Sequence, residues 1–145
     1  MEDDVRSSSS LAKKLGIKPG YVVCLLDAPG KAASAVLVVG SEGVSFSESL
    51  EDAPFDVILF WPRQLQGLKE TFARLQTKIG PDGSIWAVMP KKKYTSERGV
   101  ALSWEEMQAA GLLTDLVDNK IASVTEEDYG TRFVIRKALR EKYKK

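Results

Sequence analysis

The sequence predicts an α/β fold, a three-layer open sheet that is mostly parallel and ends in a C-terminal antiparallel hairpin. Residues 21–26, 57–61 and 84–89 are short, continuous apolar runs rich in β-branched residues, a pattern typical of strands covered on both faces, as in a parallel sheet. An amphipathic segment connects the second and third runs. The last third of the chain holds two strand-like segments around a polar turn instead, which indicates a hairpin.

The first 20 residues form a predicted lead-in with one short helix. Ser8 to Ser10 can cap residues 11–15, and Gly16 can end that helix. After the first strand, at 21–26, Asp27-Ala28-Pro29-Gly30 breaks the run. A helix of about two turns is expected from Lys31 to Val38 because alanines and leucine favour it, and a brief strand is expected at 44–46.

The central unit is predicted to be strand, helix, strand. The strand at 57–61 stops at Pro62, which cannot donate to a central ladder. Apolar residues recur at intervals of three and four from Leu65 to Ile79, which predicts an amphipathic helix. Residues 80–83 (Gly-Pro-Asp-Gly) are predicted to end it, and a third strand follows until Pro90. Such a crossover makes its two strands parallel.

The C-terminal part adds a helix, the hairpin and a tail. Ser103 and Glu106 have the spacing of a capping box before a helix that Gly111 can stop. The hairpin strands are expected at 117–124 and 131–137. We expect one domain at 21–137, flanked by the lead-in 1–20 and a basic tail at 138–145 that is either a frayed helix or disordered.

Composition narrows the class of protein. The chain has 145 residues, of which 43% are hydrophobic and 28% charged, which are globular values for one domain. No window approaches the roughly 18 apolar residues of a membrane span, and the acidic, serine-rich start has no signal-peptide core. A cytoplasmic protein without membrane association is therefore expected.

The chain contains no histidine, and Cys24 is its one cysteine. This excludes Ser-His and Cys-His nucleophile pairs, histidine-ligated metals and a histidine proton shuttle. Cys24 lies inside the first apolar run, where a buried thiol acts as a small hydrophobe. No metal site is predicted.

The order of elements resembles the Rossmann-like fold of S-adenosylmethionine-dependent methyltransferases. The resemblance covers residues 20–137 and is closest from the strand at 55–60, through the helix, to the Gly80-Pro81-Asp82-Gly83 turn and the next strand. A narrower resemblance is to a family of short, uncharacterised bacterial proteins that look like trimmed versions of this fold. It rests on Leu15 to Gly20, the turn at 26–29, and Met89-Pro90-Lys91-Lys92. That family implies the fold and leaves the activity open.

The expected cofactor loop departs from that of working methyltransferases, which have a glycine-rich, acidic loop after the first strand. Here Gly30 alone permits close backbone approach, and Pro29 contributes no amide hydrogen. Glu48, eighteen positions after Gly30, is the candidate for holding ribose hydroxyls, a spacing near the roughly 20 residues of dinucleotide folds. The resemblance implies S-adenosylmethionine as a candidate cofactor, and the residues leave the cofactor undecided.

Ligands of open α/β sheets bind beyond the carboxyl ends of the strands where the strand order reverses. That point is expected between the strands ending at Leu26 and Trp61. The predicted lining of this ligand site is Asp27, Gly30, Lys31, Trp61, Arg63 and Lys91, with Glu48 beside it. Lys31 and Arg63 could meet an anion, although solvated surface charges are the alternative interpretation.

The charges are unevenly distributed. Residues 1–62 hold five Lys/Arg and nine Asp/Glu, and residues 63–145 hold sixteen and eleven, so the halves carry −4 and +5. The net charge of the chain is nevertheless only +1, well below the strongly positive charge that is typical of nucleic-acid-binding domains. We therefore expect no nucleic-acid partner, and the tail is expected to aid solubility.

No catalytic residues are predicted. Asp27, Tyr94, Ser96 and Glu97 are conceivable acids, bases or nucleophiles, but no two have a recognised catalytic spacing. The favoured hypothesis is a non-catalytic binding protein for a small anionic or nucleotide-like ligand or a protein partner. The alternatives are a minimal S-adenosylmethionine-dependent methyltransferase, which uses Gly30 and Glu48 to hold the cofactor, and an interaction domain that uses its basic tail.

Overall fold

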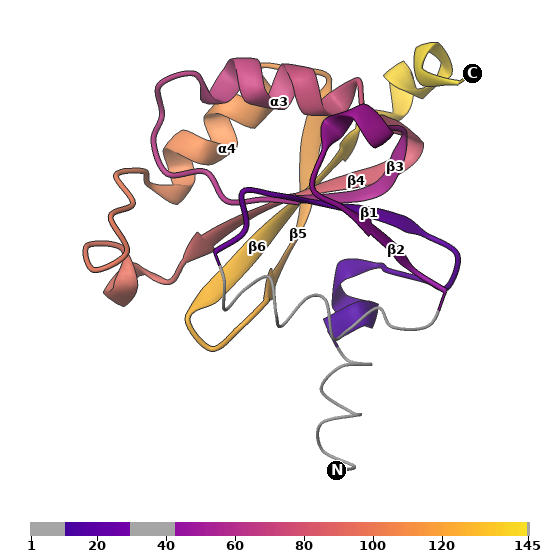
Figure 1. Ribbon diagram of the computed structural model, residues 1–145. Coiled ribbons are helices and arrows are strands. Elements are labelled where there is room, and N and C mark those ends of the chain that lie inside the picture. Colours follow the sequence, from indigo (N-terminus) through magenta and orange to yellow (C-terminus); the bar gives the residue numbers. More distant parts are fainter. Residues whose placement is uncertain (1–10, 30–42, 145) are drawn as a thin grey trace.

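The computed structural model describes residues 11–29 and 43–144, and these residues build one twisted sheet with helices against it (Figure 1). The described residues form a six-stranded sheet in the order β2-β1-β3-β4-β6-β5. β1, β2, β3 and β4 are parallel, whereas β6 is antiparallel to β4 and β5. The predicted α/β sheet with an antiparallel C-terminal hairpin is confirmed. The strands are β1 (Val22–Leu26), β2 (Ser45–Ser47), β3 (Phe55–Phe60), β4 (Ile79–Pro90), β5 (Leu116–Ser123) and β6 (Asp128–Ile135).

The strand order reverses at β1. β2 follows β1 in the chain and pairs on one side of it, whereas β3 pairs on the other side. The chain leads from β1 to β2 on one side and from β3 to β4 on the other, so the connections diverge between the carboxyl ends of β1 and β3. This is the topological switch point where open α/β sheets form ligand crevices.

Both faces of the central strands are buried, as continuous apolar runs predict. Along β3, Ile58 and Phe60 belong to one hydrophobic core, and Val57 and Leu59 belong to a second core on the opposite face. Neighbouring residues of a strand point to opposite faces. A run without polar residues therefore supplies both cores at once.

One face is covered by two helices, α3 (Leu68–Gln76) and α4 (Trp104–Leu112), which lie together above the sheet in Figure 1. Phe72 of α3 packs edge-on against Phe60, with ring centroids 5.2 Å apart. α4 begins with the predicted capping box, because Ser103 and Glu106 each bond the other's backbone amide. In the part of the chain that the structure describes, no helix is long and apolar enough to cross a membrane.

The other face is covered in part by the N-terminal lead-in. Residues 11–15 are helical, as predicted, and Gly16 follows at φ +71°, a left-handed conformation that glycine adopts readily. Leu15 is fully buried, and its carbonyl accepts a hydrogen bond of 3.1 Å from the Trp86 indole. Two predictions, the cap at Ser8 to Ser10 and the helix at 31–38, lie outside the described residues.

The predicted bounds of the central helix were wrong at both ends. α3 begins at Leu68 after Gly67, which has φ +77°, and it ends at Gln76. Leu65 precedes the helix and is 46% exposed. Leu65 fits the spacing of apolar residues at intervals of three and four, but it belongs to the loop before the helix.

Residues 80–83 were predicted as a turn, and the structure places them inside β4. Phe55 donates its amide to the Lys78 carbonyl (2.8 Å) and pairs with Ile79, and the register then shifts before Val57. The shift accommodates extra residues of β4 as a bulge. Gly83 allows the close packing there, since a Cβ would lie 2.8 Å from the Ile79 Cβ.

The C-terminal tail is docked, which corrects the expectation that it frays or is disordered. Residues Lys137–Tyr143 form the 3₁₀ helix η3, and Leu139 and Tyr143 pack against the core. The Tyr143 hydroxyl donates to Asp115 Oδ2 at 2.6 Å, and Lys142 Nζ lies 2.8 Å from the same oxygen. These contacts hold η3 against the rest of the protein.

Candidate functional site

Two adjoining hollows lie at the carboxyl ends of β1 and β3. One, of about 480 Å³, lies between β1, α3 and the 3₁₀ helix η1 (Leu50–Asp52). The other, of about 280 Å³, lies between the ends of β1 and β3. They share Leu26, Asp27 and Thr71, and we call them together the switch-point groove. Its lining is Leu26, Asp27, Glu48, Ser49, Leu50, Glu51, Phe60, Trp61, Pro62, Arg63, Gln64, Gln66, Leu68, Thr71, Arg74 and Leu75.

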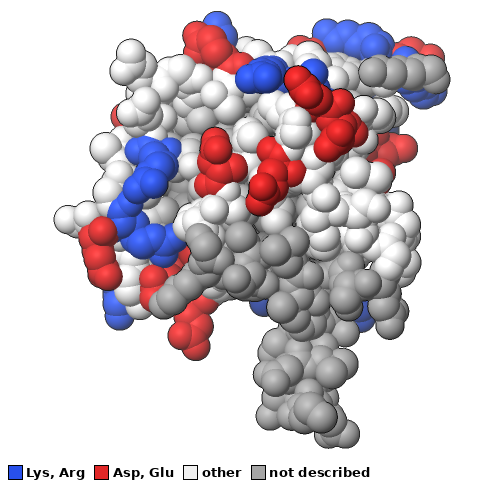
Figure 2. Space-filling model, in the orientation of Figure 1, with Lys and Arg blue, Asp and Glu red and all other residues white. Residues whose placement is uncertain are grey.

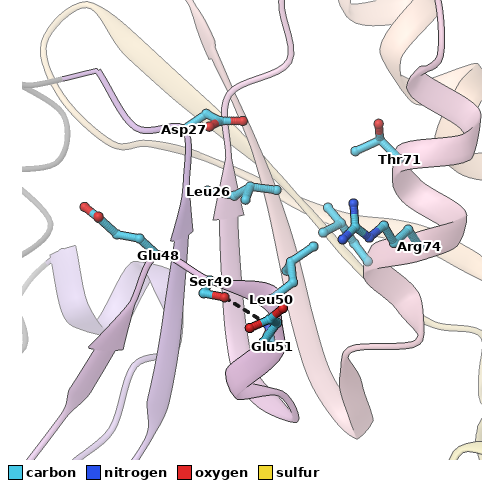
Figure 3. Close-up of a pocket in the computed structure, with 9 residues that line it drawn as sticks. Leu26, Asp27, Glu48, Ser49, Leu50, Glu51, Thr71 and Arg74 are labelled. Atoms are coloured by element: carbon cyan, nitrogen blue, oxygen red, sulfur yellow. Dashed lines mark hydrogen bonds between the residues drawn. The ribbon is translucent and has the colours of Figure 1, made fainter.

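Asp27 stands at the centre of the groove, directly after β1. Its φ of 57° places it in the left-handed region, which aspartate tolerates better than most residues but at some cost. Figure 3 shows its carboxylate directed into the space between β1 and α3. Asp27 thus lies at the strand end, and its carboxylate faces the groove.

Glu48 directly follows β2, so it lies at the same edge of the sheet as Asp27. β1 and β2 are parallel, and Cys24 pairs with Ser47, which brings the two strand ends side by side. In Figure 3 the Glu48 side chain extends away from the Thr71 and Arg74 side chains. The structure therefore places Glu48 at the rim of the groove.

The larger hollow is lined by four polar residues that were not predicted: Thr71 and Arg74 on α3, and Ser49 and Glu51 around η1. Thr71 and Arg74 are three positions apart and so share one face of the helix. Figure 3 shows the Arg74 guanidinium extended toward η1. Helical periodicity in the sequence separates buried from exposed positions, and only the folded arrangement shows that the exposed side of α3 with Arg74 borders a hollow.

Trp61 has an unused hydrogen-bond donor beside the groove. The residue is 9% exposed, and its Nε1 is buried without a hydrogen-bond partner in the structure described. Most buried polar groups are paired, and an unpaired one calls for an explanation. The Nε1 atom is itself shielded from solvent and Trp61 packs in the core on the face opposite α3, so a ligand in the groove would reach this donor only if the ring moved.

Arg63 and Lys91 were both predicted to line the ligand site, and the structure places Arg63 at the groove but not Lys91. Arg63 lines the groove, but its Nη2 donates to the Arg98 carbonyl at 2.8 Å, which ties it to the loop after β4. Lys91 does not line the groove: it borders another pocket, and its Nζ donates to the Glu126 carbonyl at 2.8 Å. Gly30 and Lys31 lie outside the described residues.

The described charges of the groove favour a cation or a hydroxyl over a phosphate. Three carboxylates line it, on Asp27, Glu48 and Glu51, against two guanidiniums, on Arg74 and Arg63. Figure 2 shows several acidic side chains across the middle of the molecule, with basic side chains at the left and near the C-terminal end. An anionic ligand would meet more repulsion than attraction at Asp27.

Two further features of the chain are the Cys24 thiol and the side chains that could bind a metal ion. Burial, with a smaller effect of Asp52, raises the pKa of the Cys24 thiol to about 11, so the thiolate form is disfavoured. Within residues 11–29 and 43–144, no cluster of three or more Asp, Glu, Cys or His residues is arranged to hold a metal ion.

Comparison of the structure with solved structures shows the class of fold. A protein similar in structure is the N-methyltransferase NodS of Bradyrhizobium japonicum, with a TM-score of 0.57 over 94% of this chain and 98% of that one, at 11% identity. An S-adenosylmethionine-dependent methyltransferase of Clostridium acetobutylicum also has a TM-score of 0.57, over 90% of this chain and 91% of that one, at 7% identity. The chain thus has a short methyltransferase-like fold.

No protein-family model matches the chain, and no curated protein matches its sequence. The identities to the solved structures are low enough that they show the fold alone. The expected Rossmann-like, methyltransferase-like architecture is confirmed. The narrower resemblance to a family of short bacterial proteins stays a prediction.

Proposed function

We propose that the chain binds S-adenosylmethionine in the switch-point groove. The observation that carries this proposal is the pair of strand-end carboxylates, Asp27 after β1 and Glu48 after β2, beside a hollow of about 480 Å³. Sites for small molecules commonly have volumes of about 300–1,000 Å³ and a few placed polar groups. The groove has that size and that composition.

The charge of the groove selects among nucleotide-like ligands. A ribose diol can donate to carboxylates such as those of Asp27 and Glu48, and charge-assisted hydrogen bonds are the stronger ones. S-adenosylmethionine also carries a sulfonium and an ammonium cation, which suit an acidic lining. ATP and NAD would bring phosphates toward the same acids. Of the anionic or nucleotide-like ligands expected from the sequence, this favours a nucleoside that carries positive charge.

The loop after β1 supports weaker binding than a glycine-rich loop would. Pro29 has no amide hydrogen, and Asp27 already occupies a left-handed conformation. Recognition would therefore depend on side chains more than on backbone amides.

Methyl transfer is a second candidate function, favoured by the methyltransferases among the structural neighbours. When bound, S-adenosylmethionine supplies an electrophilic methyl group. The chain's contribution would be to bind the cofactor and to hold an acceptor in line with it, because positioning supplies much of such catalysis. No catalytic side chain is proposed, and the initial hypothesis of binding without catalysis stays an alternative.

Titration calorimetry on the full chain and three variants tests the proposal. We expect Asp27→Asn and Glu48→Ala each to weaken S-adenosylmethionine binding at least tenfold, because a hydrogen bond to a charged group contributes about 1.5–3 kcal/mol. Asparagine also tolerates the left-handed backbone of residue 27. Glu97→Ala is the matched control, an exposed acid outside the groove lining.

The variants also separate the proposed roles. Unchanged affinity in Asp27→Asn and Glu48→Ala would overturn the assignment of these carboxylates. If Glu97→Ala weakened S-adenosylmethionine binding as much as the other two variants do, the effect would be nonspecific electrostatics. Circular dichroism on each variant checks that the fold is retained.

A further inference from the structure

A third hollow, of about 690 Å³, lies at the carboxyl end of β4, between the loop that contains η2 (Lys92–Tyr94) and the start of α4. It is larger than either hollow of the switch-point groove and shares no lining residue with them. We call it the β4-end pocket. Its lining is Met89, Pro90, Lys91, Lys92, Thr95, Val100, Leu102, Ser103, Trp104, Glu105 and Tyr129.

The walls of this pocket are mostly apolar and continuous with the core. Met89 is 1% and Leu102 is 6% exposed, and both belong to the core on the α3–α4 face. Val100, Trp104 and Tyr129 are partly buried and pack against that core. Two aromatic rings and three aliphatic side chains therefore surround the space, which suits an apolar or aromatic molecule.

A network of polar contacts holds the loop that forms one wall. Arg98 lies 3.2 Å from Glu127 and 2.9 Å from Asp128, a carboxylate that is almost fully buried. The Lys91 amide donates to the Glu127 carbonyl at 2.7 Å, which joins the loop to the β5–β6 turn. The opposite wall is also fixed, because Trp104 Nε1 donates 2.9 Å to the buried Thr131 hydroxyl. A pocket held open in this way costs little to organise when a ligand enters.

The rim has the opposite charge balance from the switch-point groove. Lys91 and Lys92 line it against one acid, Glu105. The Lys91 ammonium is engaged with the Glu126 carbonyl, whereas Lys92 is exposed at the mouth. Burial and, to a smaller extent, the Glu105 charge raise the pKa of Tyr129, and an ordinary tyrosine, with a pKa of about 10, is already protonated at neutral pH. Its hydroxyl can therefore act as a donor.

We propose that the β4-end pocket is a second small-molecule site, which takes an aromatic or apolar molecule with one anionic group. The apolar body packs between Val100, Leu102 and Trp104, and the anion lies at Lys92. This goes beyond the proposed function, because the two sites share no residue and accept opposite charges. A positively charged nucleoside and a small aromatic acid would then bind the chain independently.

The probe is 1-naphthoate, an aromatic acid, with 2-naphthol as its uncharged counterpart, titrated against the full chain by calorimetry. We expect saturable one-to-one binding of 1-naphthoate, weakened at least fivefold in Lys92→Gln. 2-Naphthol should bind more weakly and be insensitive to that substitution. Val100→Trp should fill the pocket and reduce 1-naphthoate binding at least tenfold. Lys69→Gln, an exposed lysine of α3 outside every lining described above, is the matched control and should not change binding.

The outcomes distinguish this proposal from that for the groove. Retained 1-naphthoate binding in Asp27→Asn, together with retained S-adenosylmethionine binding in Val100→Trp, supports two separate sites. If the wild-type chain does not bind 1-naphthoate saturably, or if Lys92→Gln and Val100→Trp both bind it normally, the second site is refuted. Lys92 is exposed, so Lys92→Gln reports on the site even if Val100→Trp fails to fold.

Discussion

Gly130 of β6 packs against the face of Trp86 in the neighbouring strand β4. A Cβ built on Gly130 would lie 2.8 Å from Trp86 Cε3 and 3.2 Å from a Val124 methyl. Trp86 is fully buried and its indole is held by the Leu15 carbonyl, so the ring cannot easily move aside. The absence of a side chain at residue 130 is thus part of the packing of this core.

Gly130→Ala is therefore expected to lower the free energy of unfolding by about 1–3 kcal/mol, the usual cost of overpacking. Gly80→Ala is the matched control: it is also a strand glycine, and nothing lies within 4 Å of its added Cβ. Urea unfolding of both variants measures the difference. Equal midpoints for the two would contradict the packing described.

Single residues also show what the sequence could and could not predict about the site. Asp27 was predicted because it follows the apolar run of the first strand, and Glu48 because it lies eighteen positions after Gly30, near the spacing of a ribose-binding acid. Thr71 and Arg74 were not, because helical periodicity separates buried from exposed faces but does not show which exposed face borders a hollow. Lys91 was placed in the wrong pocket for the same reason, since the path of the loop after β4 is set by tertiary contacts.

At the scale of elements, η3 is held to the sheet by the contacts of Asp115. The hydrogen bonds of Lys142 and then of Tyr143 hold the pKa of the Asp115 carboxyl below its ordinary value. A carboxylate whose pKa is lowered by folding stabilises the protein above its unfolded pKa of about 3.9. That stabilisation is lost as the pH falls through the folded value.

We therefore expect the stability difference between the wild-type chain and Asp115→Asn to be largest near pH 7 and to shrink below about pH 4. Urea unfolding at pH 7, 5 and 3 measures it. Glu141→Gln is the control, because its pair with Lys144 is largely exposed and such pairs contribute little. A difference that stays constant from pH 7 to pH 3 would show that Asp115 does not act through its charge.

The loop between β4 and α4 depends on two carboxylates that share Arg98. Asp128 is 4% exposed at its side chain and Glu127 is 41% exposed. The contacts of a buried carboxylate are screened less by water and salt than those of an exposed one, so they contribute more to stability. The two carboxylates are thus expected to differ in their importance for stability.

Asp128→Asn should destabilise the protein by about 1–3 kcal/mol, and Glu127→Gln by less than about 1 kcal/mol. Thermal and urea unfolding of the two variants test this order. The reverse order would mean that the exposed pair, and not the buried one, holds the loop.

Elements also show where local sequence patterns fail. Gly80-Pro81-Asp82-Gly83 reads as a turn, because glycine and proline are the strongest local breakers. The pairing of Phe55 with Ile79 and the bulge that follows extend β4 through these residues. The capping box at Ser103 and Glu106 was predicted well, since its contacts lie within four residues.

For the whole molecule, the order β2-β1-β3-β4-β6-β5 accounts for both pockets. The reversal at β1 opens the groove between β1, β3 and α3. The antiparallel β6 brings Tyr129 beside Met89 at the end of β4, where the second pocket forms. The fold class followed from the apolar runs and the hairpin, but their alternation along the chain does not specify which pockets the side chains leave open.

The switch-point groove is proposed to accept a cationic nucleoside. A thermal-shift titration of the full chain with S-adenosylmethionine and S-adenosylhomocysteine, with ATP and NAD as controls, tests it most directly, because a ligand that binds the folded state raises the melting temperature. We predict a saturable rise with S-adenosylmethionine, a smaller one with S-adenosylhomocysteine, which lacks the sulfonium charge, and none with ATP or NAD. No shift with S-adenosylmethionine, or equal shifts with ATP and NAD, would contradict the claim.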